Sequence, residues 1–131
     1  MDDTERMREV LARGMGCVGC VCRGLHGLPE AGWKTDDYGR IITQSDWRPD
    51  EDWAQCGMVI EAMARKRFLV HMSIYTREDG TQVANATCSR FTPGPPAEWI
   101  HATSESIDSD SIPLVACEAM ARALEAANEV S

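Results

Sequence analysis

The sequence predicts an α+β fold, a layered sandwich in which an antiparallel β-sheet of three or more strands is packed by helices. The sheet is indicated by two runs, residues 67–75 and 82–91, in which apolar side chains recur at every second position. The helices are indicated by three other segments, in which apolar residues recur with a period of roughly 3.6 residues. Residues 1–131 suffice for one domain with its own core and are too few for two of ordinary size.

The acidic composition excludes some classes of partner. Thirteen basic and twenty-one acidic residues give a formal net charge of −8, which repels a phosphate backbone, so we expect no direct nucleic-acid binding. No stretch approaches the roughly 18 to 20 apolar residues that span a bilayer, so we expect no membrane insertion. The first five residues are acidic, where a signal peptide would be basic and then apolar. We therefore expect a cytosolic protein whose six cysteines are free thiols or metal ligands.

The first elements are a helix and a loop. Residues 4–14 are expected to form a short amphipathic helix, with Thr4 as its N-cap and Gly14 as its stop. Residues 14–32 are rich in glycine and cysteine, a composition that supports neither a helix nor a long strand. We expect a loop there, with at most one short extended piece.

A small hairpin and a helix are expected next. Residues 33–47 are predicted to hold a hairpin with Asp36-Asp37-Tyr38-Gly39 as its turn and residues 40–43 as its return strand. Residues 50–66 are predicted to be a helix, because acidic residues open it and basic residues close it, as the helix dipole favours. Its expected buried stripe is Trp53, Cys56, Ile60 and Met63.

The central hairpin organises the chain. Its turn is Arg77-Glu78-Asp79-Gly80, and Asp-Gly predicts a type I′ turn, in which both central residues need positive φ. The period of two divides the first strand into a buried face with Phe68, Val70, Met72 and Ile74 and a second face with Leu69, His71, Ser73 and Tyr75.

The rest of the chain is expected to complete the sheet and cover it. Residues 92–96 are a proline-rich surface loop, and residues 99–104 are predicted to be a third strand beside residues 82–91. Residues 105–110 read as an acidic linker. Residues 111–128 are predicted to be a helix, rich in small alanines that allow close packing on the sheet, with Leu114, Cys117, Ala121 and Leu124 as its stripe.

These landmarks resemble the phage ABA sandwich domain family over roughly residues 4–127. The resemblance rests on Asp50-Glu51-Asp52-Trp53-Ala54 opening a helix, on the strands at 68–75 and 83–91, and on the closing segment 111–119. Ala12-Arg13-Gly14-Met15-Gly16-Cys17 is similar to the family's opening helix and its Met-Gly-Trp signature, with Cys17 where a tryptophan is usual. The resemblance implies a bacteriophage or prophage origin and a layered fold. It carries no catalytic residue, because the members have no assigned general function.

The cysteine-rich loop is a candidate metal site. Cys17 and Cys20 have the C-x-x-C spacing with which a tight turn grips a metal, and Cys22 or His26 would complete a tetrahedral zinc shell. A distant second pair of ligands is absent from the sequence, so loop thiols without a ligand are the other interpretation, and then there is no cofactor. Cys56, Cys88 and Cys117 fall on predicted core faces, where cysteine acts as a small buried hydrophobe.

Aromatic and cationic residues are candidates for binding a ligand. The side chains that we expect to bind it are Trp33, Tyr38, Trp47, Arg48, His71, Tyr75 and Arg90. An aromatic face beside an arginine offers stacking to a nucleobase and paired hydrogen bonds to its phosphate. The alternative is that such aromatics seal the core or an oligomer interface, which we expect for Trp53. His71, Ser73 and Tyr75 would face a ligand if they share a polar sheet surface with Asn85, Thr87, Ser89, His101 and Thr103.

The function expected from these features is binding, not catalysis. The first hypothesis is a phage-encoded accessory protein in the host cytoplasm that counteracts host defence by sequestering a small anionic, nucleotide-type ligand. The alternative is a zinc-stabilised interaction module that acts on a host or phage protein. We also expect a homo-oligomer. A hydrolase using His71 or His101 is the third hypothesis, although no nucleophile elbow surrounds a serine.

Overall fold

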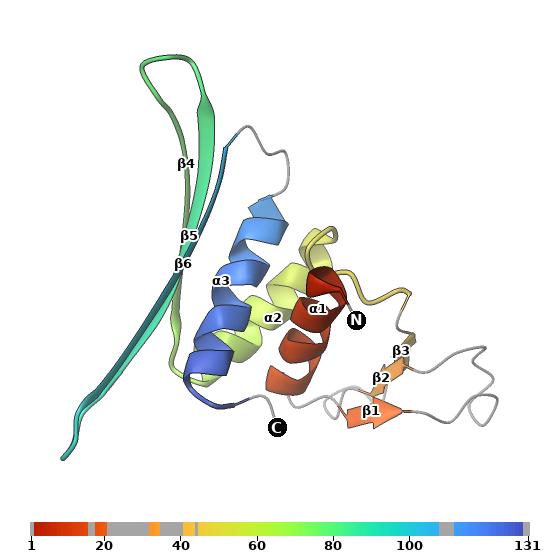
Figure 1. Ribbon diagram of the computed structural model, residues 1–131. Helices are drawn as coiled ribbons and strands as arrows, with labels where there is room; N and C mark the ends of the chain where they lie inside the picture. The colour runs from red at the N-terminus through yellow and green to blue at the C-terminus, as the bar shows by residue number, and fades with distance from the viewer. Residues whose placement is uncertain are drawn as a thin grey trace.

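The computed structural model describes residues 2–15, 18–20, 32–34, 41–43, 45–107 and 112–129. Figure 1 shows its three helices and two antiparallel sheets of three strands each. In chain order they are α1 Asp3–Gly14, β1 Val18–Cys20, β2 Gly32–Lys34, β3 Ile41–Thr43, α2 Trp53–Arg65, β4 Leu69–Thr76, β5 Gln82–Thr92, β6 Glu98–Ile107 and α3 Ile112–Ala126. The α+β class expected from the sequence is confirmed, because helices pack on a three-stranded antiparallel sheet.

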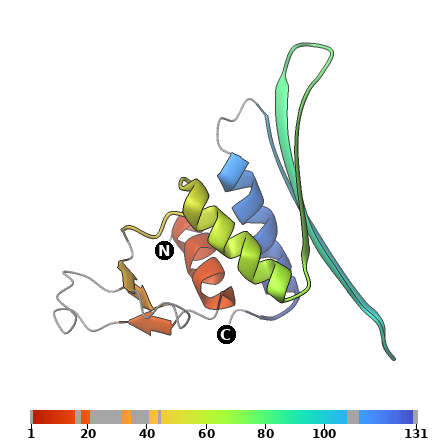
Figure 2. The same ribbon diagram turned by 180° about the vertical axis from the view of Figure 1, so that it is seen from behind.

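All three helices lie on one side of the large sheet, β4-β5-β6 (Figures 1 and 2). Helix α3 contacts β5 and β6, α2 contacts α3 and β4, and α1 packs on α3. In the part of the chain that the structure describes, no helix covers the other side of this sheet. The arrangement therefore has two layers, with one sheet face left open.

The strand register confirms the predicted alternation of the two faces, but Met72 and Ile74, expected to be buried, are 36% and 50% exposed. Val70 pairs with Cys88 and Cys88 pairs with Ala102, and directly paired residues point to the same face of a sheet. This row faces the helices, on what we call the inner face. The outer face carries Leu69, His71, Ser73, Tyr75, Val83, Asn85, Thr87, Ser89, Phe91, Trp99, His101, Thr103, Glu105 and Ile107.

Small side chains bring α3 close to the inner face. The sheet contributes Ala84, Ala86 and Ala102, and α3 contributes a row of buried alanines. Because short side chains keep the two backbones close, α3 buries most of its length against β5 and β6. The close packing expected of the alanine-rich helix is confirmed.

The hairpin turn differs from the expectation. Gly80 has φ +87°, but Asp79 does not have positive φ, so the predicted type I′ turn is wrong. The Gly80 amide donates to the Arg77 carbonyl at 3.0 Å, and the Arg77 amide donates to the Thr81 carbonyl at 2.8 Å. This is a three-residue loop closed by a left-handed glycine. In addition, β6 continues to Ile107, so the first part of the expected linker 105–110 is strand.

Two helix starts also differ from the expectation. Asp2, not Thr4, caps α1, and its carboxylate accepts a hydrogen bond from the Glu5 amide at 2.7 Å. Helix α2 begins at Trp53, because Asp52 accepts from the Gln55 amide at 3.0 Å and so acts as its N-cap. Helix α2 buries Cys56, Val59 and Met63, and at about 100° per residue Trp53 lies roughly a quarter turn away from that stripe. Trp53 is 56% exposed, so the prediction that it seals the core is wrong.

The small sheet confirms the predicted second hairpin. Strands β2 and β3 pair antiparallel, with Trp33 opposite Ile42. Strand β1 adds to β2 and lies within the segment that the sequence analysis assigned to loop with one short extended piece. The expected turn at residues 36–39 lies outside the described residues.

A partly buried ion pair joins α1 to the segment before α2. Arg8 donates from Nε to Asp50 Oδ1 at 2.7 Å and from Nη2 to Oδ2 at 3.0 Å. Asp50 is only 5% exposed, so its carboxylate depends on this partner, and the same contact raises the pKa of Arg8. Trp47 Nε1 donates to the Arg8 carbonyl at 2.8 Å and holds the same junction.

Replacing Asp50 with asparagine removes the buried carboxylate that Arg8 contacts twice and leaves the guanidinium only the exposed Glu51 carboxylate, at 3.2 Å, as a charged acceptor. We expect Asp50→Asn to lower the free energy of unfolding by about 2 kcal/mol, measured by chemical denaturation. The control is Glu61→Gln, which removes an exposed 3.0 Å ion pair with Arg65 and changes stability by less than about 0.5 kcal/mol. Equal effects of the two substitutions would show that the Arg8 pair does not hold the junction.

Three cysteines lie in the core, as the sequence predicts. Cys56, Cys88 and Cys117 are free thiols and fully buried. Burial raises the pKa of Cys88 to about 12. A hydrogen bond between Cys56 and Cys117 lowers the pKa of Cys56 and raises that of Cys117. These side chains pack as hydrophobes and are not exposed nucleophiles.

The raised pKa of Cys88 predicts a slow thiol, because only about one molecule in ten thousand would carry the thiolate at pH 8. We expect iodoacetamide to leave Cys88 unmodified in the native protein at pH 8 and to modify it fully in guanidinium chloride. Mass spectrometry of the Cys88 peptide measures both. Rapid modification of Cys88 in the native protein would contradict its buried position on β5.

Candidate functional site

The outer face gathers most of the exposed apolar surface of the described chain. Eight large hydrophobic side chains are exposed among the described residues, and five of them belong to this face. They are Leu69, Tyr75, Phe91, Trp99 and Ile107. The register places them in two groups, one at each end of the face, and exposed apolar patches mark interaction sites in soluble proteins. The outer face is therefore the candidate functional site.

An aromatic cluster occupies the end of the outer face where β6 begins. The Trp99 ring stacks on the His101 ring, with centroids 6.0 Å apart and planes 8° apart. Phe91, opposite Trp99 in the register, lies at 6.3 Å from it with a tilt of 48°. Trp99 is 62% exposed. These contacts hold a large aromatic surface in one orientation while leaving it open to solvent.

The centre of the outer face is polar. His71, Thr87 and Thr103 form one row across the three strands. Ser73, Asn85 and Glu105 form the next row. The expectation that the polar residues of the strands share one surface is confirmed. Beyond this centre, Tyr75 and Ile107 flank the buried Val83, so apolar residues return at the far end.

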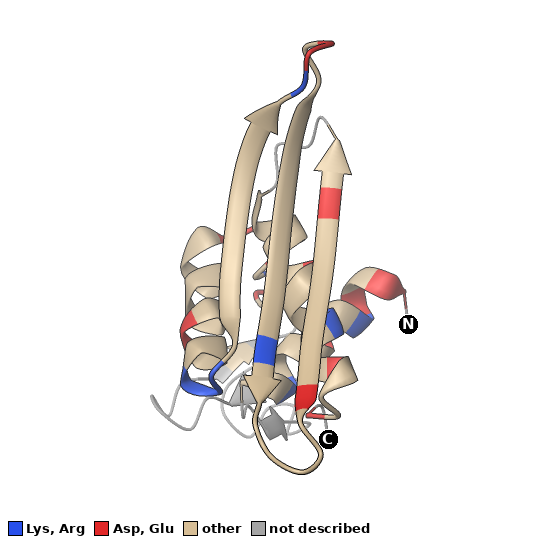
Figure 3. Ribbon diagram, turned by 90° about the vertical axis from the view of Figure 1, so that its left-hand side faces the viewer, with Lys and Arg blue, Asp and Glu red and all other residues tan. Residues whose placement is uncertain are grey.

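Charge is nearly absent from the outer face. Figure 3 looks at this face and shows few charged positions along the strands. By register, Glu105 is the one ionised group among its strand residues, and Arg77 pairs with it at 3.1 Å. Arg90, coloured on β5, belongs to the inner face because it pairs with the buried Ile100. No lysine or arginine of the three strands therefore points outward to meet a phosphate.

Trp47 is a core residue. It is 1% exposed, so the expectation that it offers an aromatic face to a ligand is wrong. Its indole Nε1 donates to the carbonyl of Arg8, at the junction where the Arg8 side chain pairs with Asp50. A distant ion pair of this kind leaves no local signal in the sequence around residue 47.

Arg48 does not sit in an anion site. It lines a surface groove of about 520 Å³ with Ser45 and three carboxylates, those of Asp46, Glu51 and Asp52. Its Nε donates to the Ser45 carbonyl at 2.7 Å, and its Nη1 lies 3.8 Å from Glu51. Three acidic groups around one cation disfavour an anionic ligand, so the predicted role of Arg48 is not supported here.

Arg90 stabilises the fold. Its guanidinium lies 4.3 Å above the Phe68 ring, and its Nη1 donates to the Lys66 carbonyl at 3.2 Å and to Glu129 at 3.3 Å. These contacts tie the residues after α3 to the start of the sheet. Nη1 is engaged within the protein, whereas Nε is buried without a hydrogen-bond partner in the described structure. The contacts of Arg90 support a role in the fold, and its predicted ligand binding stays a prediction.

The other predicted site residues fall in three groups. His71 and Tyr75 are exposed on the outer face, as expected. Tyr38, Cys17, Cys22 and His26 lie outside the described residues. Trp33 and Cys20 are placed only by the backbones of β2 and β1. Among the described residues, no group of three or more potential ligands is arranged to hold a metal ion.

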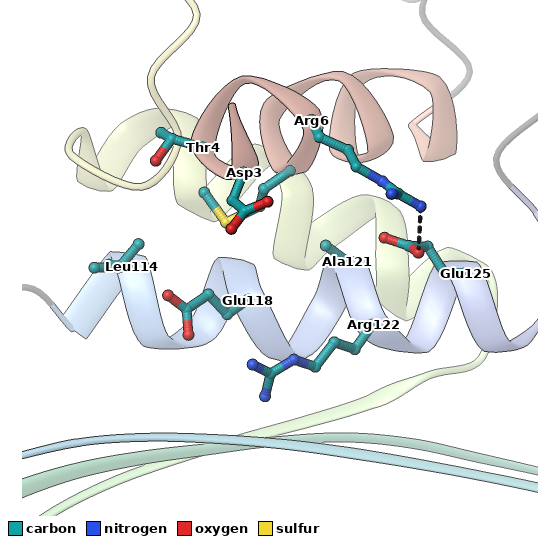
Figure 4. A pocket seen from close by; sticks show the side chains of 9 residues that line it. Asp3, Thr4, Arg6, Leu114, Glu118, Ala121, Arg122 and Glu125 are labelled. Carbon is teal, nitrogen blue, oxygen red and sulfur yellow. Dashed lines mark hydrogen bonds and ion pairs between the residues drawn. The ribbon is translucent and has the colours of Figure 1, made fainter. Parts of the chain in front are cut away.

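Besides the groove at Arg48, the surface has a hollow between α1 and α3 that the sequence did not predict. It encloses about 430 Å³, and Figure 4 shows its charged lining. Arg6 pairs with Glu125 at 3.2 Å, Glu118 accepts from the Ser104 hydroxyl at 2.6 Å, and Arg122 donates to the Thr103 carbonyl at 2.6 Å. Four of its five charged groups are engaged with the protein itself, so this hollow is less suited to a ligand than the outer face.

Comparisons with protein-family models, with curated proteins and with solved structures give no match. In the described part of the chain, none of the helices combines the length and apolar character needed to cross a membrane. The chemistry of the outer face is therefore the basis for the function proposed below.

Proposed function

We propose that this is a binding protein, not an enzyme, and that it recognises another protein with the outer face of β4-β5-β6. The observation that carries the proposal is the concentration of exposed apolar side chains on a sheet face that no described helix covers. Protein interfaces combine large aromatic anchors with polar groups that fix orientation. The outer face has this composition, with Trp99 and Phe91 at one end and a polar centre beside them.

Trp99 is the proposed anchor. Tryptophan is among the residues that contribute most to binding when a partner covers them, and its loss of conformational freedom on binding is small if it is already held. His101 and Phe91 hold its ring before any partner arrives. The hydroxyl and amide groups of Thr87, Asn85 and Thr103 both donate and accept, so they can satisfy the backbone of a partner.

A small nucleotide-type ligand is the second candidate, and the exposed stack of Trp99 on His101 favours it. Open sheets with aromatic side chains do stack nucleobases. The phosphates, however, need cations, and no lysine or arginine of the three strands lies on the outer face. With Trp47 buried and Arg48 among carboxylates, the groups first expected at such a ligand are not brought together. We therefore prefer a protein partner.

The non-catalytic part of the proposal is supported by the positions of the histidines. His71 and His101 lie on the two outer strands, with β5 between them. Among the described residues, no hydroxyl or thiol is hydrogen-bonded to either imidazole, whereas an activated nucleophile needs such a base.

The biological setting follows from the resemblance to the phage ABA sandwich domain family. A phage or prophage origin would make the partner a host or phage protein, and the site of action the host cytoplasm. Three buried free thiols fit a reducing compartment. Zinc held by Cys17, Cys20, Cys22 and His26 stays a proposal, as does an anti-defence role.

Site-specific photo-crosslinking tests the proposed face. A benzoylphenylalanine at Thr103, exposed on the outer face, is expected to form an adduct with a second protein in bacterial cells, whereas the same group at Glu61, exposed on α2, is not. Trp99→Ala is expected to reduce the Thr103 adduct at least tenfold, because it removes the anchor. Trp53→Ala, a tryptophan of similar exposure away from the sheet, is the matched control and should leave the adduct unchanged.

Two results would contradict the proposal. One is an adduct that forms equally from Glu61 or is indifferent to Trp99→Ala. The other is saturable heat on calorimetric titration with cyclic or adenosine-derived dinucleotides that is lost in His71→Ala. The second result would move the assignment to the nucleotide-type ligand.

A further inference from the structure

Strand β4 is an edge without protection. It lies at one side of the order β4-β5-β6, and no described segment pairs with its free side. Its eight residues, Leu69–Thr76, include no proline, lysine, arginine, aspartate or glutamate. The opposite edge strand, β6, carries Glu98 and Glu105. Soluble monomers ordinarily place charges, prolines or bulges on exposed edges, because an open row of backbone groups invites another strand.

Strand β4 is also exposed on both of its faces. Half of the large exposed hydrophobic side chains of the described chain belong to it, namely Leu69, Met72, Ile74 and Tyr75. Met72 and Ile74 point to the inner face, yet they are 36% and 50% exposed. The reason is that α2 leads directly into the start of β4, while the far end of the hairpin projects past the helices (Figures 1 and 2).

We infer that β4 pairs antiparallel with β4 of a second copy of this chain, across a two-fold axis at Met72. The result is a sheet of six strands in the order β6-β5-β4-β4-β5-β6. This interface uses the strand edge, not the outer face, so it is independent of the proposed function.

The sequence of β4 is complementary to itself about Met72. In an antiparallel pair centred there, Leu69 lies opposite Tyr75, Val70 opposite Ile74, and His71 opposite Ser73. From Leu69 to Tyr75, apolar side chains thus meet apolar ones and polar meet polar. Centring the pair on His71 sets Leu69 against Ser73, and centring it on Ser73 sets Val70 against Thr76, so neighbouring registers lose this match.

The two-fold arrangement also covers the inner-face side chains of β4 that are exposed in a single chain. Because the strands run in opposite directions, the end of the partner's α2 that adjoins its β4 comes near the far end of this β4, beside Met72 and Ile74. The inner-face side chains that this chain's own helices leave open are then enclosed. The strand bears no formal charge, so the net charge of −8 is not brought together at the seam.

The mass in solution tests the inference. Analytical ultracentrifugation of the full chain at micromolar concentration is expected to give twice the 14.5 kDa of one chain. Met72→Lys sets two ammonium groups against each other at the axis and is expected to raise the dimer dissociation constant at least about tenfold. Ile107→Lys, on the exposed end of the other edge strand, is the matched control and should leave the dimer intact.

A single cysteine gives a test that does not depend on Met72→Lys folding. Residues opposite each other in an antiparallel pair have Cα atoms about 4.5 to 5.5 Å apart, within reach of a disulfide. Met72→Cys is expected to form a covalent dimer with oxidised glutathione, in which the linked peptides both contain position 72. A monomer at all concentrations would overturn the inference. So would a dimer indifferent to Met72→Lys, or a linkage through Ile107→Cys in place of Met72→Cys, which would identify β6 as the interface.

Discussion

The helices pack on one side of β4-β5-β6 only, and this packing determines which surfaces of the sheet are buried and which are open. The inner face is lined by small residues, Ala84, Ala86 and Ala102 among them, and the alanine-rich α3 lies directly against it. Helices α1 and α2 then pack beside α3, and the Arg8 and Asp50 ion pair closes their junction. The described helices all lie on this one side of the sheet, and no described helix covers the opposite face.

The open parts of the sheet differ in chemistry. The outer face is broad and combines held aromatic rings with hydroxyl and amide groups, which suits recognition of side chains and backbone of another protein. The free edge of β4 is narrow and uncharged, and it offers backbone hydrogen bonds. A six-stranded dimer would leave both outer faces open and place them side by side, so the two proposed interfaces are geometrically compatible.

The sequence predicted those features that depend on a local period. Alternation at every second residue was enough to assign the two faces of β4, because a strand has only two. The small residues of 111–128 likewise predicted the close approach of the last helix. The hairpin was found correctly, but its turn type was wrong because Gly80 alone takes the left-handed conformation that the prediction also required of Asp79. The polar centre of the outer face was also expected from the sequence. The exposed apolar cluster of Phe91 and Trp99, at one end of that face, was not.

Features that depend on distant contacts could not be predicted in the same way. Trp47 is buried and its indole donates to the distant Arg8 carbonyl, whereas Trp53 lies beside the buried stripe of α2 and is exposed. Arg48 and Arg90 both looked free in the sequence, and both are engaged once the chain folds. An arginine next to aromatics in a sequence therefore does not indicate a ligand until its protein partners are known.

Quenching of tryptophan fluorescence by acrylamide tests the open outer face most directly. In variants that keep Trp99 or Trp47 as the one tryptophan, with the others changed to phenylalanine, we expect strong quenching of Trp99 and little of Trp47, as their 62% and 1% exposures require. Equal protection of both indoles in the purified protein would mean that another layer covers the sheet, and would contradict an outer face open to solvent.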